Sequence, residues 1–317
     1  MKLGGIPQTP IERIGKALGL LPQPLLDTHI AMLLARSIME GTRLGVFEAL
    51  KDAPLPAEEV AARCGCDPKA MRKLAPRSLR DKMLWQLWEW GFIEKTGDYV
   101  RTGRPVAFHH EMSPEEWRDY QRGMKAVAAT WVPEAARRTP VPKGAQDLLD
   151  VGGSHGLLSA ALCRRHPGLR AVILDLPAAI EHAAPLLAEE GMGERVTHRA
   201  GDVLTDDLGT AAWDVILVAN LLHHFDEATN RELAKRIAKA LRPGGVYVIQ
   251  EIYRPESPKQ AGQIGALLDL YFALTSQAGT WSFAEMAGWQ REAGLAPRKP
   301  VKFVTAPGSG QQAAVKR

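Results

Sequence analysis

A glycine-rich turn between two apolar segments is the strongest constraint on how this chain folds. Residues 147–156 read Asp-Leu-Leu-Asp-Val-Gly-Gly-Ser-His-Gly, so that a short apolar run enters the turn directly. The run predicts a buried β-strand, and glycines let the backbone approach a ligand because no Cβ blocks it. A second apolar segment ends in Asp175, and an acid there can accept hydrogen bonds from both hydroxyls of a ribose. The pair predicts a nucleoside-containing cofactor at the carboxyl ends of a parallel sheet.

The order of residues in the turn argues against a dinucleotide. The dinucleotide pattern G-x-G-x-x-G needs a glycine where this chain has Val151. What remains is Asp150-x-Gly152-Gly153-x-x-Gly156, in which the leading acid would repel a pyrophosphate and suits a cationic ligand. S-adenosylmethionine (SAM) carries a sulfonium and an ammonium and no phosphate. We therefore predict that SAM is the cofactor.

The C-terminal half alternates strand-like and helix-like patterns. Strands are expected at 147–151, 171–175, 195–200, 213–219 and 246–251, and helices at 155–166, 177–190 and 227–241. Such alternation predicts an α/β fold with a doubly wound, mostly parallel sheet. Two more strand-like segments, 302–305 and 313–316, flank Pro-Gly-Ser-Gly and predict a closing antiparallel hairpin. The expected sheet has seven strands.

The N-terminal half is expected to be mainly helical. A helical pattern over 25–50 precedes a helix–turn–helix pattern over 56–74, a helix over 79–90 and a segment, 91–103, that could form a β-wing. This order predicts a winged helix. A further helix from Pro114 to residue 130 is expected to link the two halves. The expected divisions are 1–110, 111–140 and 141–317.

Composition limits the partners of the chain. It has 45% hydrophobic and 24% charged residues, and its net charge of +4 is spread along the sequence without a long basic run. We find no apolar stretch long enough to span a bilayer and no secretion signal at the N-terminus. Three cysteines fit a reducing cytosol, and no second Cys/His pair completes a metal site with Cys64 and Cys66. We expect a cytoplasmic protein that binds no metal, nucleic acid or membrane.

The motifs resemble those of plant-type and bacterial secondary-metabolite O-methyltransferases, of the caffeic-acid and hydroxyneurosporene type. The matching segments within 147–294 are Leu149-Asp-Val-Gly-Gly-Ser-His-Gly, Leu174-Asp-Leu-Pro, Gly201-Asp-Val, Leu222-His-His-Phe, Leu241-Arg-Pro-Gly-Gly and Val248-Ile-Gln-Glu. Residues 33–50 resemble the dimerisation domain of that family, so the resemblance implies a homodimer in which a winged helix pairs subunits and covers the acceptor pocket.

This chain departs from the family pattern at three places. The glycine loop carries Ser154-His155 where the family usually has Gly-Thr. The winged-helix stretch over 74–80 is short. Thr280 stands where plant members have a second acid beside the catalytic histidine. The last departure leaves the acid–base details of catalysis open.

The candidate catalytic residues are His223 and Glu251, for which a structural residue at a helix start and a strand-end acid facing water are the respective alternatives. Methyl transfer from a sulfonium is an in-line displacement, in which the enzyme positions the acceptor and removes its proton. His223 follows the fourth expected strand at the cofactor end of the sheet and matches the general base of the family. Its neighbour His224 is expected to point away. Glu251 ends the fifth strand, where a carboxylate could hold the His223 tautomer.

The remaining site predictions concern the two ligands. By resemblance, Asp202 and Val203 bracket the adenine, although Asp202 could also be a simple turn residue. The predicted cofactor residues are Asp150, Gly152, Gly153, Gly156, Asp175, Leu176, Asp202, Val203 and Asn220. The acceptor-pocket candidates are Met124, Trp131, Leu268, Phe272 and Trp281, and core packing is an equal alternative for each.

The leading hypothesis is a SAM-dependent O-methyltransferase that acts on a hydroxyl of an aromatic small molecule, such as a polyketide or phenolic. A C- or N-methyltransferase, or a SAM-fold enzyme with changed chemistry, is the alternative within the same class. A winged-helix DNA-binding regulator is the alternative from another class, and basic residues such as Arg72, Lys73 and Arg77 favour it. The sequence does not name the acceptor.

Overall fold

The computed structural model describes residues 31–32, 35–36, 38–51, 55–67, 80–106, 112–254, 258–276, 278–306 and 308–317. The chain divides into two compact units, Met1–Leu87 and Trp88–Arg317. The divisions at 110 and 140 expected from the sequence stay predictions.

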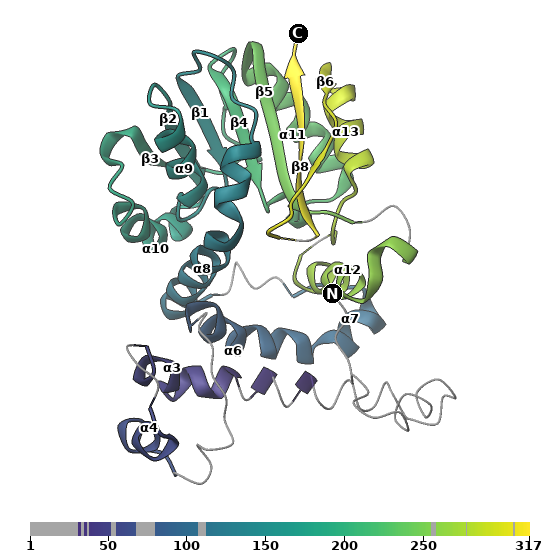
Figure 1. The fold of residues 1–317 in the computed structure, drawn as a ribbon. Helices are drawn as coiled ribbons and strands as arrows, with labels where there is room; N and C mark the ends of the chain where they lie inside the picture. The colour runs from purple at the N-terminus through teal and green to yellow at the C-terminus, as the bar shows by residue number, and fades with distance from the viewer. Residues whose placement is uncertain are drawn as a thin grey trace, which may run out of the picture. The chain divides into compact units, whose positions relative to one another are not determined.

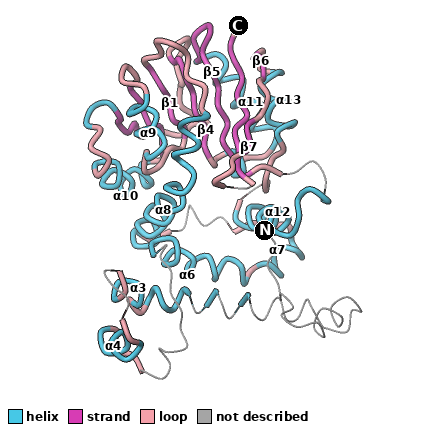
Figure 2. Tube along the Cα trace, in the orientation of Figure 1, coloured by secondary structure: helices cyan, strands magenta, loops and turns pink. Residues whose placement is uncertain are grey.

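An eight-stranded sheet forms the centre of the second unit (Figure 1). Its order is β3 (Val196–Ala200), β2 (Arg170–Asp175), β1 (Asp147–Val151), β4 (Trp213–Ala219), β5 (Leu241–Ile252), β8 (Ser309–Lys316) and β6 (Leu295–Pro297), with β7 (Val301–Lys302) paired to β8. The first five strands are parallel, and β8 runs antiparallel to β5, β6 and β7. Figure 2 shows the strands in magenta with helices in cyan around them. The mostly parallel α/β fold and its closing hairpin are confirmed. The three-residue β6 was not predicted, and it raises the number of strands from seven to eight.

Helices cover both faces of this sheet. The helices of the second unit after β1 are α9 (Leu157–Arg165), α10 (Pro177–Ala188), α11 (Glu227–Ala240), α12 (Pro258–Thr275) and α13 (Phe283–Glu292). Leu149 and Ile216 face the cluster that α11 and α13 complete. Leu148 and Leu217 face the cluster that α8 (Pro114–Arg138) and α9 complete. Because both faces are buried, the consecutive central residues of β1 and β4, such as Leu148–Leu149 and Ile216–Leu217, are apolar.

The helix α8 begins at a capping box. The Ser113 hydroxyl accepts a hydrogen bond from the Glu116 backbone N–H (3.2 Å), and the Glu116 carboxylate accepts one from the Ser113 N–H (2.7 Å). This arrangement satisfies two donors at a helix start. The helix ends at Arg138, well beyond the predicted end at 130, and contains Pro133.

The elements described before β1 are helical. They include α3 (Val46–Ala49), α4 (Ala57–Arg63), α6 (Arg80–Glu94) and α7 (Thr96–Thr102). The β-wing expected over 91–103 is therefore wrong. Hydrogen bonds within a turn favour the helix there: Thr96 Oγ1 donates to the Ile93 carbonyl (2.6 Å) and Thr102 Oγ1 to the Asp98 carbonyl (2.8 Å). The second helix expected within 56–74 falls largely outside the described residues, so the rest of the winged-helix assignment stays a prediction.

Candidate active site

The predicted cofactor and catalytic residues lie along one edge of the sheet. The parallel strands β1 to β5 end at this edge, which is where open α/β sheets bind ligands. Backbone hydrogen bonds join neighbouring strand ends: the Gly201 N–H donates to the Asp175 carbonyl (2.9 Å), and the Asn220 N–H donates to the Gln250 carbonyl (2.8 Å). The structure therefore brings the predicted residues together at one edge, and what they can do chemically depends on their side chains.

Packing requires two glycines of the loop after β1. A Cβ on Gly153 would lie 2.5 Å from the carboxyl carbon of Asp150, and one on Gly156 would lie 2.6 Å from Ile173 Cδ1. Gly156 also precedes α9 with a left-handed φ of 70°. The loop can therefore lie closely against Asp150 and the sheet only with glycine at these positions.

Asp150 is a buried acid with an unused oxygen. Its Oδ2 accepts a hydrogen bond from Ser159 Oγ (2.6 Å), whereas Oδ1 has no hydrogen-bond partner among the described residues, although Asp150 is only 2% exposed. Burial raises the pKa of Asp150 to about 7; the Ser159 hydrogen bond opposes the shift and the charge of Asp175 adds to it. A cation paired with this oxygen would offset the free-energy cost of burying it without a hydrogen bond. The site therefore fits a cationic cofactor such as SAM.

Asp175 is held in place by two backbone donors. Its Oδ2 accepts from the Ser154 N–H (2.9 Å) and its Oδ1 from the Leu176 N–H (2.8 Å). Burial raises the pKa of Asp175, while these two hydrogen bonds and the nearby His198 oppose the shift. Each carboxylate oxygen can accept more than one hydrogen bond, so both remain able to receive ribose hydroxyls. The exposed side chain of Leu176 lies next in the chain.

Three further cofactor candidates, Asp202, Val203 and Asn220, follow β3 and β4, and the two polar ones have local hydrogen-bond partners. Asp202 Oδ1 accepts from the Leu204 N–H (2.8 Å), which is the turn role considered above, and Val203 is buried. Asn220 has a φ of 51°, and its side-chain oxygen accepts from Gln250 Nε2 (3.1 Å). Contacts of these residues with an adenine or a methionine moiety stay predictions.

His223 and Glu251 form a buried pair. His223 Nδ1 lies 3.0 Å from Glu251 Oε2, and the two residues are 5% and 2% exposed. Glu251 Oε1 accepts from the backbone N–H groups of Leu221 and Leu222 (2.8 Å each), at the start of the 3₁₀ helix η3 (Leu222–His224). This carboxylate fixes both the backbone before His223 and the ring nitrogen that carries the proton. Nε2 of His223 is then the nitrogen that can accept a proton.

His224 does not point away from His223, contrary to the prediction. The two ring centroids are 4.3 Å apart, and His224 Nδ1 lies 2.9 Å from Ser276 Oγ. The expectation assumed that adjacent side chains diverge, but the two rings tilt by 53° and pack together in the short turn of η3. Ser276 was not identified from the sequence, because it lies 52 residues away without a motif.

The acceptor-pocket candidates have different surroundings. The Phe272 ring lies 4.2 Å from the His223 ring, and Leu268 precedes it by one turn of α12. Trp281 is buried in the core, where its Nε1 donates to the Leu222 carbonyl (3.0 Å). Trp131 packs against the core cluster under α8 and α9. Phe272 thus contacts His223, and the pocket as a whole stays a prediction.

Thr280 does contact a carboxylate, that of Asp269 on α12, which was not identified from the sequence. Asp269 Oδ1, on α12, accepts from the Thr280 N–H (2.9 Å) and from the Thr280 hydroxyl. Gly279, with a φ of 82°, turns the chain between them, and a Cβ there would lie 3.1 Å from the same oxygen. Asp269 thus anchors α12 to the segment that carries Trp281.

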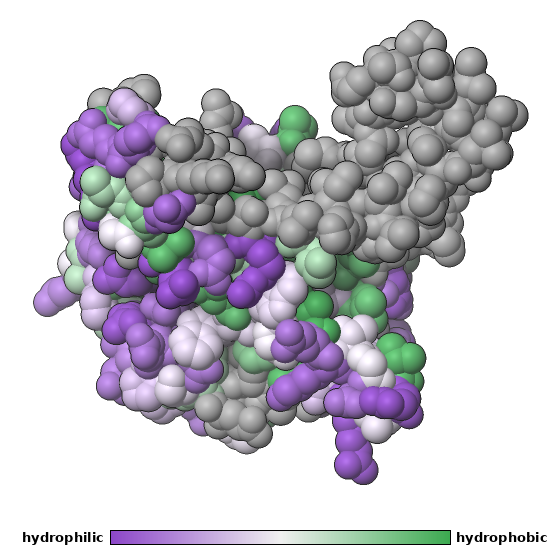
Figure 3. Space-filling model, turned by 90° about the horizontal axis from the view of Figure 1, so that it is seen from below, coloured by the Kyte–Doolittle hydropathy of each residue, from purple (hydrophilic) through white to green (hydrophobic). Residues whose placement is uncertain are grey.

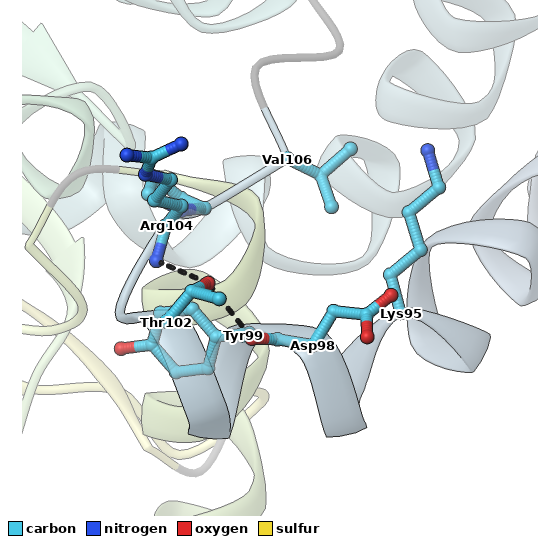
Figure 4. A pocket seen from close by; sticks show the side chains of 7 residues that line it. Lys95, Asp98, Tyr99, Thr102, Arg104 and Val106 are labelled. Atoms are coloured by element: carbon cyan, nitrogen blue, oxygen red, sulfur yellow. Dashed lines mark hydrogen bonds between the residues drawn. The ribbon is translucent and has the colours of Figure 1, made fainter.

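A separate hollow lies beside α7, away from the motif residues (Figure 4). It measures about 330 Å³ and is lined by Lys95, Asp98, Tyr99, Thr102, Arg104, Pro105 and Val106. Thr102 Oγ1 accepts from the Arg104 N–H (3.2 Å) at its rim. None of the predicted site residues lines it.

Among the residues that the structure describes, no group of three or more His, Cys, Asp or Glu side chains could hold a metal ion, and no helix is long and apolar enough to cross a membrane.

Comparison with known proteins identifies the family. Residues 90–295, more than half of the chain, match the O-methyltransferase domain. The chain belongs to the O-methyltransferase family. SAM is the methyl donor of these enzymes, and the unpaired Asp150 oxygen in the glycine loop suits that cofactor.

Individual relatives agree with this assignment. A 3-hydroxy-5-methyl-1-naphthoate 3-O-methyltransferase of Streptomyces sahachiroi is 32% identical over 55% of this chain, a stretch that spans half the length of that relative. A tetracenomycin polyketide synthesis 8-O-methyltransferase of Streptomyces glaucescens is 27% identical over 86% of this chain and 91% of its own length. Human N-acetylserotonin methyltransferase, solved in complex with SAM, shares the fold, with a TM-score of 0.79, 17% identity and coverage of 98% and 99% of the two chains.

Proposed function

We propose that this O-methyltransferase transfers the methyl group of SAM to a hydroxyl of an aromatic small molecule of the polyketide or phenolic class, with His223 as the general base. The relatives that act on a naphthoate and on a tetracenomycin polyketide support this acceptor class. The observation that carries the proposal is the buried His223–Glu251 pair (3.0 Å) at the cofactor edge of the sheet.

The pair is arranged for proton removal. Glu251 holds the proton of His223 on Nδ1, which leaves Nε2 to take the proton of an acceptor hydroxyl. The imidazolium that forms is stabilised by the same carboxylate. Phe272 packs on the ring of His223 (4.2 Å) and restricts its orientation. Bound SAM supplies the electrophilic methyl group, while these residues orient and deprotonate the acceptor.

An acceptor screen tests the proposal. The protein is incubated with SAM and a panel of hydroxylated naphthoates, tetracyclic polyketides and simple phenols, and products that gain one methyl group are identified by mass spectrometry. With the best acceptor, His223→Ala should lower kcat by roughly a hundred- to ten-thousand-fold and leave the Kd for SAM unchanged. Glu251→Gln should lower kcat less, because it disturbs orientation and not the transfer itself.

The matched control is His182→Ala, which alters a half-buried histidine on α10. It should retain wild-type kcat. Near-full turnover by His223→Ala at neutral pH, with a phenolic acceptor, would show that His223 is not the base. If no hydroxylated acceptor in the panel is methylated while SAM still binds, the acceptor class is wrong.

A nitrogen acceptor is the second candidate. An N,N-dimethyltransferase of Streptomyces rimosus is 24% identical to this chain over 288 residues. Amines in the same panel separate the two functions, because a neutral amine attacks without prior loss of a proton. Methylation of an amine that survives His223→Ala would favour this candidate.

We also propose that the enzyme is a cytoplasmic homodimer. The three cysteines are free thiols, as a reducing compartment favours. Apolar side chains are exposed on α6, α7 and α12: Ile93 (49%), Val100 (71%) and Leu267 (54%). On the face in Figure 3, apolar groups lie among hydrophilic ones, a mixture that is common at interfaces.

A further inference from the structure

The two residues at which the cofactor loop departs from the family pattern, Ser154 and His155, both contact α8. Ser154 Oγ donates to the side-chain oxygen of Gln121, which is 1% exposed. The buried ring of His155 lies beside the same helix, where burial and the charge of Lys125 lower its pKa. Two successive residues of the loop therefore lie against α8, and Ser154 is hydrogen-bonded to it.

Ser154 is held in a backbone conformation that it would not adopt alone. Its φ is 52°, in the left-handed region that residues with a Cβ rarely occupy. Three elements hold it there: its N–H donates to Asp175 Oδ2 (2.9 Å), its hydroxyl to Gln121, and its carbonyl lies 2.8 Å from His198 Nε2. Strained residues of this kind persist where their surroundings fix them, often at ligand sites.

The helix α8 is also electrostatically coupled to Asp175. Tyr120 precedes Gln121, and its pKa is raised first by burial and then by the charges of Asp175 and Glu89. Ser154 joins the two groups, because its N–H donates to Asp175 Oδ2 and its hydroxyl donates to Gln121. A shift of α8 would be transmitted to Asp175 through Ser154.

We propose that Gln121 and Ser154 form a latch between α8 and the cofactor loop, which holds Asp175 ready for the ribose of SAM. Gln121 is then a positioning residue for the cofactor, on a helix that contributes no cofactor motif. The latch rests on the proposed cofactor site, and it is independent of the acceptor and of the role of His223. We therefore predict that the affinity for the cofactor depends on the Ser154–Gln121 hydrogen bond, although this bond does not contact the cofactor.

Titration calorimetry of the full chain with S-adenosylhomocysteine tests the latch. Gln121→Leu removes the α8 partner, and Ser154→Gly removes the loop partner while glycine accepts the left-handed backbone at no cost. Each variant should weaken binding by roughly five-fold, the worth of one hydrogen bond, and should raise the dissociation rate. The double variant should bind no more weakly than either single one, because both changes remove the same bond. Arg122→Leu, at the exposed neighbouring position, is the matched control and should bind as wild type does.

The outcomes are distinct. Unchanged affinity in both single variants would overturn the latch, and so would losses that add in the double variant. Thermal unfolding of each variant shows whether it is folded, and the strain relieved in Ser154→Gly favours a folded protein. Asp175→Ala tests the underlying site: if it weakens binding while the latch variants do not, the latch alone is wrong. Unchanged binding by Asp175→Ala would overturn the cofactor site and the latch with it.

Discussion

At the scale of single residues, the site is built from acids and histidines whose proton affinity depends on burial. Asp150 and His155 are separated by only four residues in the chain, yet burial shifts both toward their neutral forms: the pKa of Asp150 is raised to about 7 and that of His155 lowered to about 4. Each shift has a measurable consequence.

Asp150 should release a proton when SAM binds. At pH 6 the acid is mostly protonated, because its pKa is about 7 in the ligand-free protein. A cation beside Oδ1 favours the ionised form and lowers that pKa, so binding should expel a proton into the buffer. Calorimetry at pH 6 in two buffers of different ionisation enthalpy counts the protons. The Asp150→Asn variant should release no proton from this position when SAM binds. If wild type and Asp150→Asn release the same number of protons, Asp150 is not the group that the bound cation ionises.

His155 should make the fold sensitive to acid. Its pKa in the folded chain is about 4, lowered chiefly by burial and by Lys125 of α8, while Glu190 opposes the shift; the ordinary value is 6.5. Above pH 6.5 the ring is neutral in both states, and the free energy of unfolding is at its full value. As pH falls from 6.5 toward 4, only the unfolded chain takes up the proton, so this group lowers the free energy of unfolding by up to about 3 kcal/mol.

Urea unfolding at pH 7 and pH 4.5 checks this dependence. Other groups titrate over the same range, so the informative quantity is the difference between wild type and His155→Asn, which has no titratable ring. Wild type should lose more stability on acidification than the variant. If wild type and His155→Asn lose the same free energy of unfolding between pH 7 and pH 4.5, His155 does not cause the acid sensitivity.

At the scale of elements, the docking of α12 depends on Asp269. Its Oδ1 accepts two hydrogen bonds from Thr280, which is 3% exposed. Asp269→Ala would leave the Thr280 N–H buried without a partner and should lower the free energy of unfolding by about 1–3 kcal/mol. Asp269→Asn keeps an accepting oxygen and should cost less. Urea unfolding measures both, and S-adenosylhomocysteine affinity should stay constant, since the strand edge supplies the proposed cofactor contacts.

The positions of some elements could be predicted from the sequence, and those of others could not. β4 was placed correctly at Trp213–Ala219, because its apolar run is short and rich in β-branched residues, which favours a strand over a buried helix. The three-residue β6 is too short to show any period. The contact of Asp269 with Thr280 crosses eleven residues and depends on the turn at Gly279, which no periodic pattern reveals. The motifs predicted which residues lie together at the strand ends, whereas side-chain partners such as Gln121 and Ser276 could be identified only from the fold.

At the scale of the whole molecule, we expect a dimer in solution. Within residues 33–50, which resemble the dimerisation domain of the family, Val46 packs inside the first unit against Val60 and Ala61. Ile93 and Leu270 stay exposed on α6 and α12. Light scattering at micromolar concentration should give twice the mass of one chain, and Ile93→Glu with Leu270→Glu should give a monomer.

Val304→Glu is the matched control for that pair, because Val304 is an apolar residue 76% exposed on the connection between β7 and β8. It should leave the mass unchanged. If wild type is a monomer at micromolar concentration, the dimer is refuted. If Val304→Glu also gives a monomer, the interface does not lie at Ile93 and Leu270 alone.

The position of Phe272 and Leu268 on a single helix has a consequence for engineering. The proposed methyl-donor contacts are distributed over strand ends that are hydrogen-bonded to one another, such as Gly201 to Asp175. By contrast, α12 is one continuous segment of 18 residues, anchored by Asp269 to Thr280 and by Tyr271 to Glu89. A library that randomises positions 268 and 272 and retains Asp269 would therefore search for new acceptors while the donor site is left intact.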